Sequence, residues 1–131
     1  MKRSRIKPKV SDFEREFRAM KLIVHERSQG VCEAAALVAQ RVLEFLYAPD
    51  SEEHTAVLDA AKEFLAGREC LGRATNTHHR KYRSRGGTNS LDNLIDLCGP
   101  CHEWIHAYPI ESNLLGLSLH ANESEEIPSP H

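Results

Sequence analysis

Four cysteines set the strongest constraint on how this chain can fold. Cys98 and Cys101 enclose a Gly-Pro pair, whereas Cys32 and Cys70 stand far apart in the sequence. A CGPC string is compatible with a thiol redox pair, but such a pair needs a thioredoxin-like βαβ unit, and too little chain follows to form one. Four thiolates can instead hold one zinc ion in a closed tetrahedral site. The cysteines therefore predict structural zinc, with thiol oxidoreductase chemistry as the alternative.

The long interval between Cys32 and Cys70 is unusual, because paired zinc cysteines normally lie a few residues apart. Between them, apolar residues recur at helical spacing in two stretches that are separated at Pro49. We expect residues 36–66 to form an inserted helical hairpin whose ends bring the two cysteines together. The alternative is that Cys32 is a small buried hydrophobe and that another group completes the site. The hairpin could also mediate association, so monomer and homodimer both stay open.

The pattern of apolar and turn-forming residues predicts an α+β fold in a single domain. Its expected segments are a basic arm (1–10), an N-terminal helix (11–27), the helical insertion (36–66), a β-loop-β-α segment (68–109), and a strand followed by an acidic tail (110–131). The expected strands are 74–77, 94–97 and 114–119.

Charge is distributed unevenly along the chain, although the formal net charge is only −2. The basic side chains gather in residues 1–9 and 68–85, whereas residues 44–67 and 86–131 are net acidic. No stretch reaches the roughly 18 apolar residues of a membrane span, and no apolar signal core follows the basic start. A cytoplasmic location without membrane contact is therefore expected.

Histidines occur in the same segment as the cysteine pair. His78 and His79 are adjacent on an expected strand, where successive side chains point to opposite faces, so they cannot easily share one task. His102 and His106 lie four apart on the expected helix and share a face, a geometry that can bind one cation. Asn93 lies between the two pairs. The pattern indicates a functional cluster rather than isolated surface histidines.

The strings HHRKYRSRGG, DNL and LCGPCHEWIH occur in this order and resemble the HNH endonucleases, also called ββα-metal or His-Me finger nucleases. The similarity is greatest to their small zinc-containing phage members and covers residues 68–109, with a weaker likeness around Cys32. It implies a zinc-stabilised, treble-clef-like ββα-metal core and metal-dependent DNA endonuclease activity, by nicking or double-strand cleavage. The long insertion departs from the family's pattern.

The same resemblance implies a role for each clustered residue. His79 would be the general base that takes a proton from the attacking water. The side-chain oxygen of Asn93 would orient His79 by accepting the imidazole N–H that does not face the water. His78 would bind a divalent ion together with His102 and His106. Zinc, nickel and manganese suit such ligands, and the resemblance adds magnesium. The expected products have 5′-phosphate and 3′-hydroxyl ends.

The resemblance also changes the interpretation of the basic residues. Beside a phosphodiester-cleaving motif, they are expected to contact phosphates of double-stranded DNA. The residues concerned are Arg73, Arg80, Lys81, Arg83 and Arg85. Phage or prophage encoding, action in the host cytoplasm and the packaging terminase as a partner are further implications. The alternative is a zinc-stabilised DNA-binding module without catalysis, which would need neither His79 nor Asn93.

Overall fold

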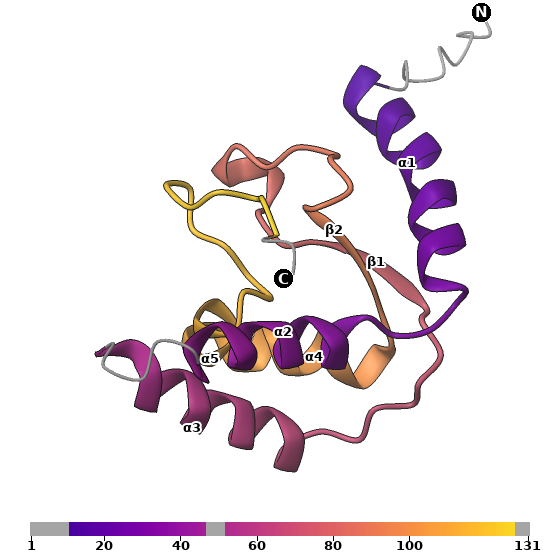
Figure 1. Cartoon of the computed structure of the whole chain (residues 1–131). Coiled ribbons are helices and arrows are strands. Elements are labelled where there is room, and N and C mark those ends of the chain that lie inside the picture. Colours follow the sequence, from indigo (N-terminus) through magenta and orange to yellow (C-terminus); the bar gives the residue numbers. More distant parts are fainter. Residues whose placement is uncertain (1–10, 47–51, 128–131) are drawn as a thin grey trace, which may run out of the picture.

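The computed structural model describes residues 11–46 and 52–127 and confirms the predicted α+β class. This described part contains five α-helices and a two-stranded antiparallel sheet (Figure 1). The predicted basic arm lies outside it, as does the connection between the two helices of the insertion. None of the described helices is long and apolar enough to cross a membrane.

The predicted insertion is a pair of packed helices, α2 (Ala34–Leu46) and α3 (Glu53–Ala66). Their apolar side chains form much of the core, together with residues of β2, α4 and the segment after α5. At the centre, the rings of Phe64 and Trp104 meet edge-on with centroids 5.1 Å apart. The start of α2 and the chain after α3 lie near each other (Figure 1). The chain therefore folds out through α2 and returns through α3.

The sheet and the helix after it form a ββα unit. Strands β1 (Asn76–His79) and β2 (Leu94–Leu97) pair antiparallel, and helix α4 (Gly99–Ala107) begins two residues after β2. Strand β2 has the predicted bounds, whereas β1 begins two residues later than predicted. Pro100 occupies the first turn of α4, where its missing N–H breaks no helical hydrogen bond.

The predicted strand over residues 114–119 is wrong. This region contains helix α5 (Pro109–Leu114) followed by turns and bends, and its one β-bridge joins Leu119 to Lys81. The leucines of these turns are buried in the core. Consecutive turns can therefore bury leucines that alternate with small residues, as a strand would. Over so few residues, the sequence pattern does not distinguish such turns from a strand.

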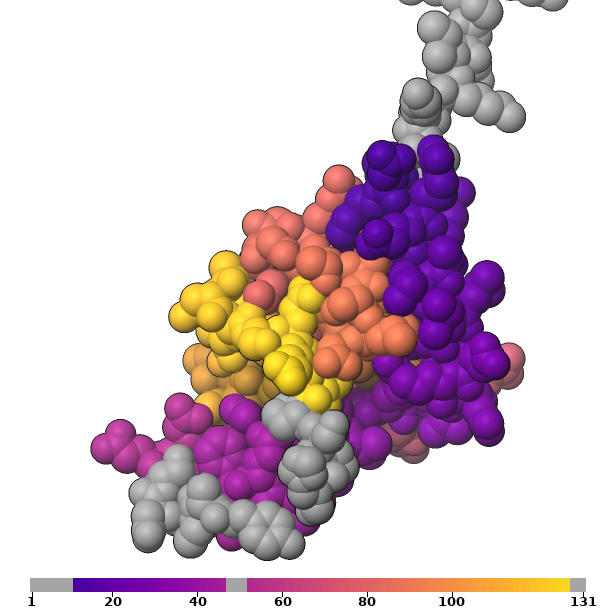
Figure 2. All heavy atoms as spheres, turned by 45° about the horizontal axis from the view of Figure 1, so that its top comes forward, coloured from indigo at the N-terminus to yellow at the C-terminus, as the bar shows by residue number. Residues whose placement is uncertain are grey.

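The acidic segment after these turns packs, up to residue 127, beside the loop that joins β1 to β2 (Figure 2). Glu125 accepts hydrogen bonds from the backbone N–H of Thr88 and from the hydroxyls of Thr88 and Ser90. Burial raises the pKa of the Glu125 carboxyl, but the hydrogen bonds from Thr88 and Ser90 and the charge of Lys81 together lower the pKa below its ordinary value. This part of the predicted tail therefore helps to fix the loop.

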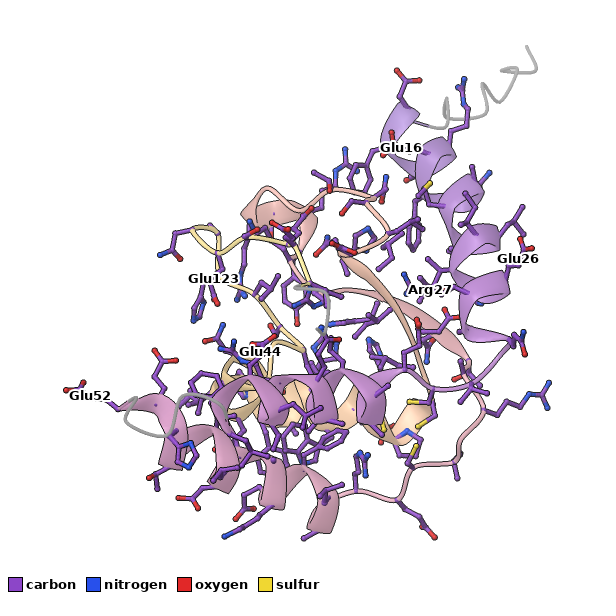
Figure 3. The ribbon with its side chains drawn as sticks, in the orientation of Figure 1. Glu16, Glu26, Arg27, Glu44, Glu52 and Glu123 are labelled. Carbon is purple, nitrogen blue, oxygen red and sulfur yellow. The ribbon has the colours of Figure 1, made fainter. Side chains whose placement is uncertain are left out.

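The C-terminal end of helix α1 (Asp12–Ser28) is attached to the sheet. The buried carboxylate of Asp96 on β2 accepts hydrogen bonds from His25 Nδ1 at 2.7 Å and from Ser28 Oγ at 2.6 Å. Arg27 points from α1 towards the strands, and its guanidinium donates to two backbone carbonyls at and before the start of β2 (Figure 3). The N-terminal half of α1 extends along the ββα unit from this attachment (Figure 1).

Candidate metal centres and active site

The four cysteines come together where the inserted hairpin closes. Cys32 precedes α2, Cys70 follows α3, and Cys98 and Cys101 stand at the start of α4. Their sulfur atoms all lie within 4.8 Å of one another, and all four are free of disulfide bonds. The structure thus brings Cys32 to the other three, and the four sulfurs could bind one zinc ion.

Two glycine turns hold the distant cysteines side by side. The Cys32 N–H donates to the carbonyl of Gly72, and the Ala74 N–H donates to the carbonyl of Gly30, each at 2.8 Å. Gly30 and Gly72 have φ of 77° and 76°, a conformation that residues with a Cβ rarely adopt. The paired turns place Cys32 and Cys70 at the same end of the hairpin.

The chemistry of this cysteine set fits zinc. The hydrogen bond from the Cys101 thiol, opposed by burial, lowers the pKa of the Cys32 thiol to about 5, and the same contact raises the pKa of Cys101. A thiolate, the form that binds metal, is therefore already favoured at one sulfur. Nearby, Arg68 lies over the Phe64 ring, and its buried Nε finds no hydrogen-bond partner among the described residues. This cation would offset the net negative charge of four thiolates around Zn²⁺.

A second set of ligands consists of His78 on β1 with His102 and His106 on α4, and its ring nitrogens lie within 4.8 Å of one another. His78 Nε2 donates to the carbonyl of Leu117 at 3.0 Å, so the lone pair for a metal is on Nδ1. Burial lowers the pKa of His78 to about 4, and burial also lowers the pKa of His102. Both rings are therefore neutral at neutral pH, and the set could hold one divalent ion.

His79 contacts helix α1 instead of this three-histidine set. Its Nε2 lies 2.8 Å from Oδ1 of Asn89, in the loop between β1 and β2. Its ring also contacts two rings of α1, Phe13 with centroids 5.7 Å apart and Phe17 with centroids 4.6 Å apart. The two adjacent histidines of β1 thus lie in different surroundings, because successive side chains of a strand point to opposite faces.

The prediction that Asn93 accepts a hydrogen bond from His79 is wrong. Asn93 is fully buried, and its Oδ1 accepts from the Lys81 N–H at 2.7 Å. Its Nδ2 donates to the carbonyls of Lys81 and Thr88. Asn93 therefore joins the two ends of the β1–β2 loop, and Asn89 is the residue that contacts the imidazole.

The family model described as HNH endonuclease matches residues 67–107. These residues are similar to that family, and we call residues 67–107 the HNH segment. The match confirms the recognition made from the sequence and supports a nuclease or DNA-binding function. The HNH segment includes the three-histidine set, His79, Asn89, Asn93 and three of the four cysteines, whereas Cys32 lies outside it. No curated protein and no solved structure matches the chain.

One of the basic residues predicted to contact DNA is instead part of the interior of the HNH segment. Arg80 is only 5% exposed, and its guanidinium donates to the backbone carbonyls of Gly116, Asp92 and Glu125 at 2.7–2.9 Å. It therefore links the loop to the C-terminal segment and is not a phosphate ligand. The other four basic residues are exposed or half-buried: Arg73, Lys81, Arg83 and Arg85.

Replacing Arg80 with methionine should destabilise the protein by at least about 3 kcal/mol, because three carbonyls lose a charged donor and each unsatisfied group costs about 1–3 kcal/mol. Urea unfolding followed by circular dichroism measures this change. The same substitution at exposed Arg73 is the control and should alter the free energy of unfolding by no more than about 0.5 kcal/mol. Equal stabilities of the two variants would contradict the structural role of Arg80.

Two residues of the HNH segment that contact the candidate site are not distinguished by the sequence pattern. Asn89 contacts His79, and the hydroxyl of Tyr82 lies 3.4 Å from Nδ1 of His106, while the two rings stack. Asn89 and Asn93 lie four residues apart in one loop, and their spacing does not show which one reaches a histidine. The one sequence signal that could have indicated a role for Tyr82 is its position among the basic residues.

Proposed function

We propose that the chain is a metal-dependent endonuclease that hydrolyses phosphodiester bonds of double-stranded DNA. The observation that supports this best is that adjacent residues of β1 supply both a member of the three-histidine set, His78, and a separate imidazole, His79, within the HNH segment. Hydrolysis needs positive charge at the phosphate and a proton acceptor for water. A module that only binds DNA needs neither.

In the proposed reaction, His79 takes a proton from a water molecule while the water oxygen forms a bond to phosphorus. The bond from phosphorus to the 3′ oxygen breaks, and that oxygen takes a proton from solvent. The products are 5′-phosphate and 3′-hydroxyl ends. When bound by His78, His102 and His106, a divalent ion would supply positive charge at the phosphate, and magnesium, manganese, nickel and zinc are the candidates.

Four basic side chains of the HNH segment are the proposed phosphate contacts: Arg73, Lys81, Arg83 and Arg85. Two of them are held beside the histidines by aromatic rings, with Arg83 4.3 Å from the centroid of Phe13 and Arg85 4.9 Å from that of Tyr82. Preordered cations of this kind would fix a DNA backbone next to His79 without selecting a base sequence.

The sequence resemblance to small zinc-containing phage nucleases supports the remaining parts of the proposal. These are encoding by a phage or prophage, action in the host cytoplasm and a role beside terminase in DNA packaging. The cysteine set would hold structural zinc and the histidine set the catalytic ion, so the two metals would have separate tasks.

Cleavage of supercoiled plasmid tests the proposed activity. We expect the zinc-loaded protein to nick or linearise plasmid when magnesium or manganese is added, and His102→Ala to reduce the rate by at least about tenfold, because one ligand of the histidine set is lost. Glu103→Gln, at the exposed next position of α4, is the matched control and should cleave like the wild type. An intact plasmid in every metal, with DNA binding retained in a gel shift, would favour the binding module instead.

A further inference from the structure

Helix α1 contributes directly to the surroundings of the proposed catalytic histidine. Phe13 and Phe17 lie four residues apart and therefore share one face of the helix. Both rings contact the imidazole of His79. This contact is made by the half of α1 that lies far from its attachment at Asp96, so the helix meets the ββα unit at two separate places.

Asn89 joins this half of α1 to His79 through hydrogen bonds at both ends of its amide. Its Nδ2 donates to the backbone carbonyl of Phe13 at 2.9 Å, and its Oδ1 lies 2.8 Å from Nε2 of His79. Asn89 is 2% exposed, so water does not compete readily for these bonds. The amide is thus a buried polar bridge between α1 and His79.

The bridge determines which nitrogen of His79 has the proton. A backbone carbonyl can only accept a hydrogen bond, so the amide must present its nitrogen to Phe13 and its oxygen to His79. The amide oxygen can also only accept, so Nε2 of His79 must be the donor. In the neutral ring the lone pair is then on Nδ1.

We propose that Asn89, oriented by the Phe13 carbonyl of α1, is a positioning residue that holds His79 in the Nε2-protonated form and makes Nδ1 the proton acceptor. The assignment of Nδ1 as the proton acceptor in catalysis rests on the proposed nuclease function. The assignment of the proton to Nε2 does not rest on that function. Helix α1 is accordingly part of the active site, although it lies outside the HNH segment. Asn93 does not position His79, because its amide forms hydrogen bonds with the backbone of Lys81 and Thr88.

The form of the His79 ring can be measured by ¹⁵N NMR of the full-length, zinc-loaded protein at mildly alkaline pH, where imidazole is neutral. The His79 signals are assigned by their loss in His79→Gln. We expect the wild type to show a protonated Nε2 and an unprotonated Nδ1. Asn89→Leu should give a mixture of the two forms and lower kcat for plasmid cleavage by about 10–100-fold with little change in KM. Asn89→Asp keeps an acceptor for Nε2 and should retain the wild-type form.

The matched control is Asn76→Ala, which removes an exposed asparagine at the start of β1 and should change neither the spectrum nor kcat. A wild-type ring protonated on Nδ1 would overturn the proposal, even if Asn89→Leu failed to fold. An unchanged ring form in a folded Asn89→Leu protein would also overturn it. If the ring forms behave as expected but the wild type leaves plasmid intact, the positioning role stands and the nuclease function fails.

Discussion

Replacing His79 with alanine should leave a folded, zinc-loaded protein whose plasmid cleavage is reduced by about 10²–10⁴-fold, the usual contribution of a general base. The side chain is only half-buried and takes part in neither set of metal ligands. The expected loss therefore comes from removal of the proton acceptor and not from loss of a metal. Initial rates of nicking under saturating DNA, together with zinc content and thermal unfolding, measure the three properties separately.

Two further measurements make this prediction specific. His120→Ala removes an exposed histidine of the C-terminal segment and should retain the wild-type rate. In His79→Ala, the space beside Phe13 and Phe17 is open to a free imidazole, and added imidazole should restore part of the activity. Wild-type cleavage by His79→Ala would refute its role as the base, and a loss of zinc in this variant would assign the effect to structure.

The arrangement of the ligand sets could be predicted because it depends on spacing and residue chemistry. Adjacent residues on a strand face opposite sides, and residues four apart on a helix share a face, so His102 and His106 had to lie together. Only four cysteines are present, and a helical hairpin returns to its starting point, so Cys32 could be expected to reach the others. The start of α1 was also predictable, because serine is a preferred residue at the N-terminus of a helix. In the structure, Ser11 accepts a hydrogen bond from the Glu14 N–H.

The sequence did not predict the roles of residues that depend on tertiary contacts. Arg80 stands in a basic run, and nothing in that run shows that its guanidinium enters the interior to meet three backbone carbonyls. The resemblance implied that Asn93 contacts His79, but the loop places the Asn89 amide against the imidazole instead. The contact of Phe13 with His79 joins residues that are far apart in the sequence, and a helical pattern gives only the face on which Phe13 lies.

Substituting serine for Cys101 should cause the largest loss of stability in this protein. Cys32, Cys98 and Cys101 are buried and belong to the same hydrophobic core as Phe64 and Trp104. Structural zinc contributes on the order of 10–16 kcal/mol to the folding of small zinc domains, and a whole domain is stable by only about 5–15 kcal/mol. We therefore expect Cys101→Ser to lose zinc and to unfold, as measured by metal analysis and circular dichroism. Removal of zinc from the wild type with a chelator should have the same effect.

Comparison with His102→Ala separates the two metal sets, because both residues lie on α4, one position apart. His102 is a member of the three-histidine set, so its loss should weaken cleavage with added magnesium or manganese by at least about tenfold, while zinc content and melting temperature stay close to those of the wild type. If Cys101→Ser remained folded without zinc, the cysteine set would not be the support of the core. If His102→Ala also lost the zinc and unfolded, the two sets would be a single structural unit, and a separate catalytic ion would have no place in this fold.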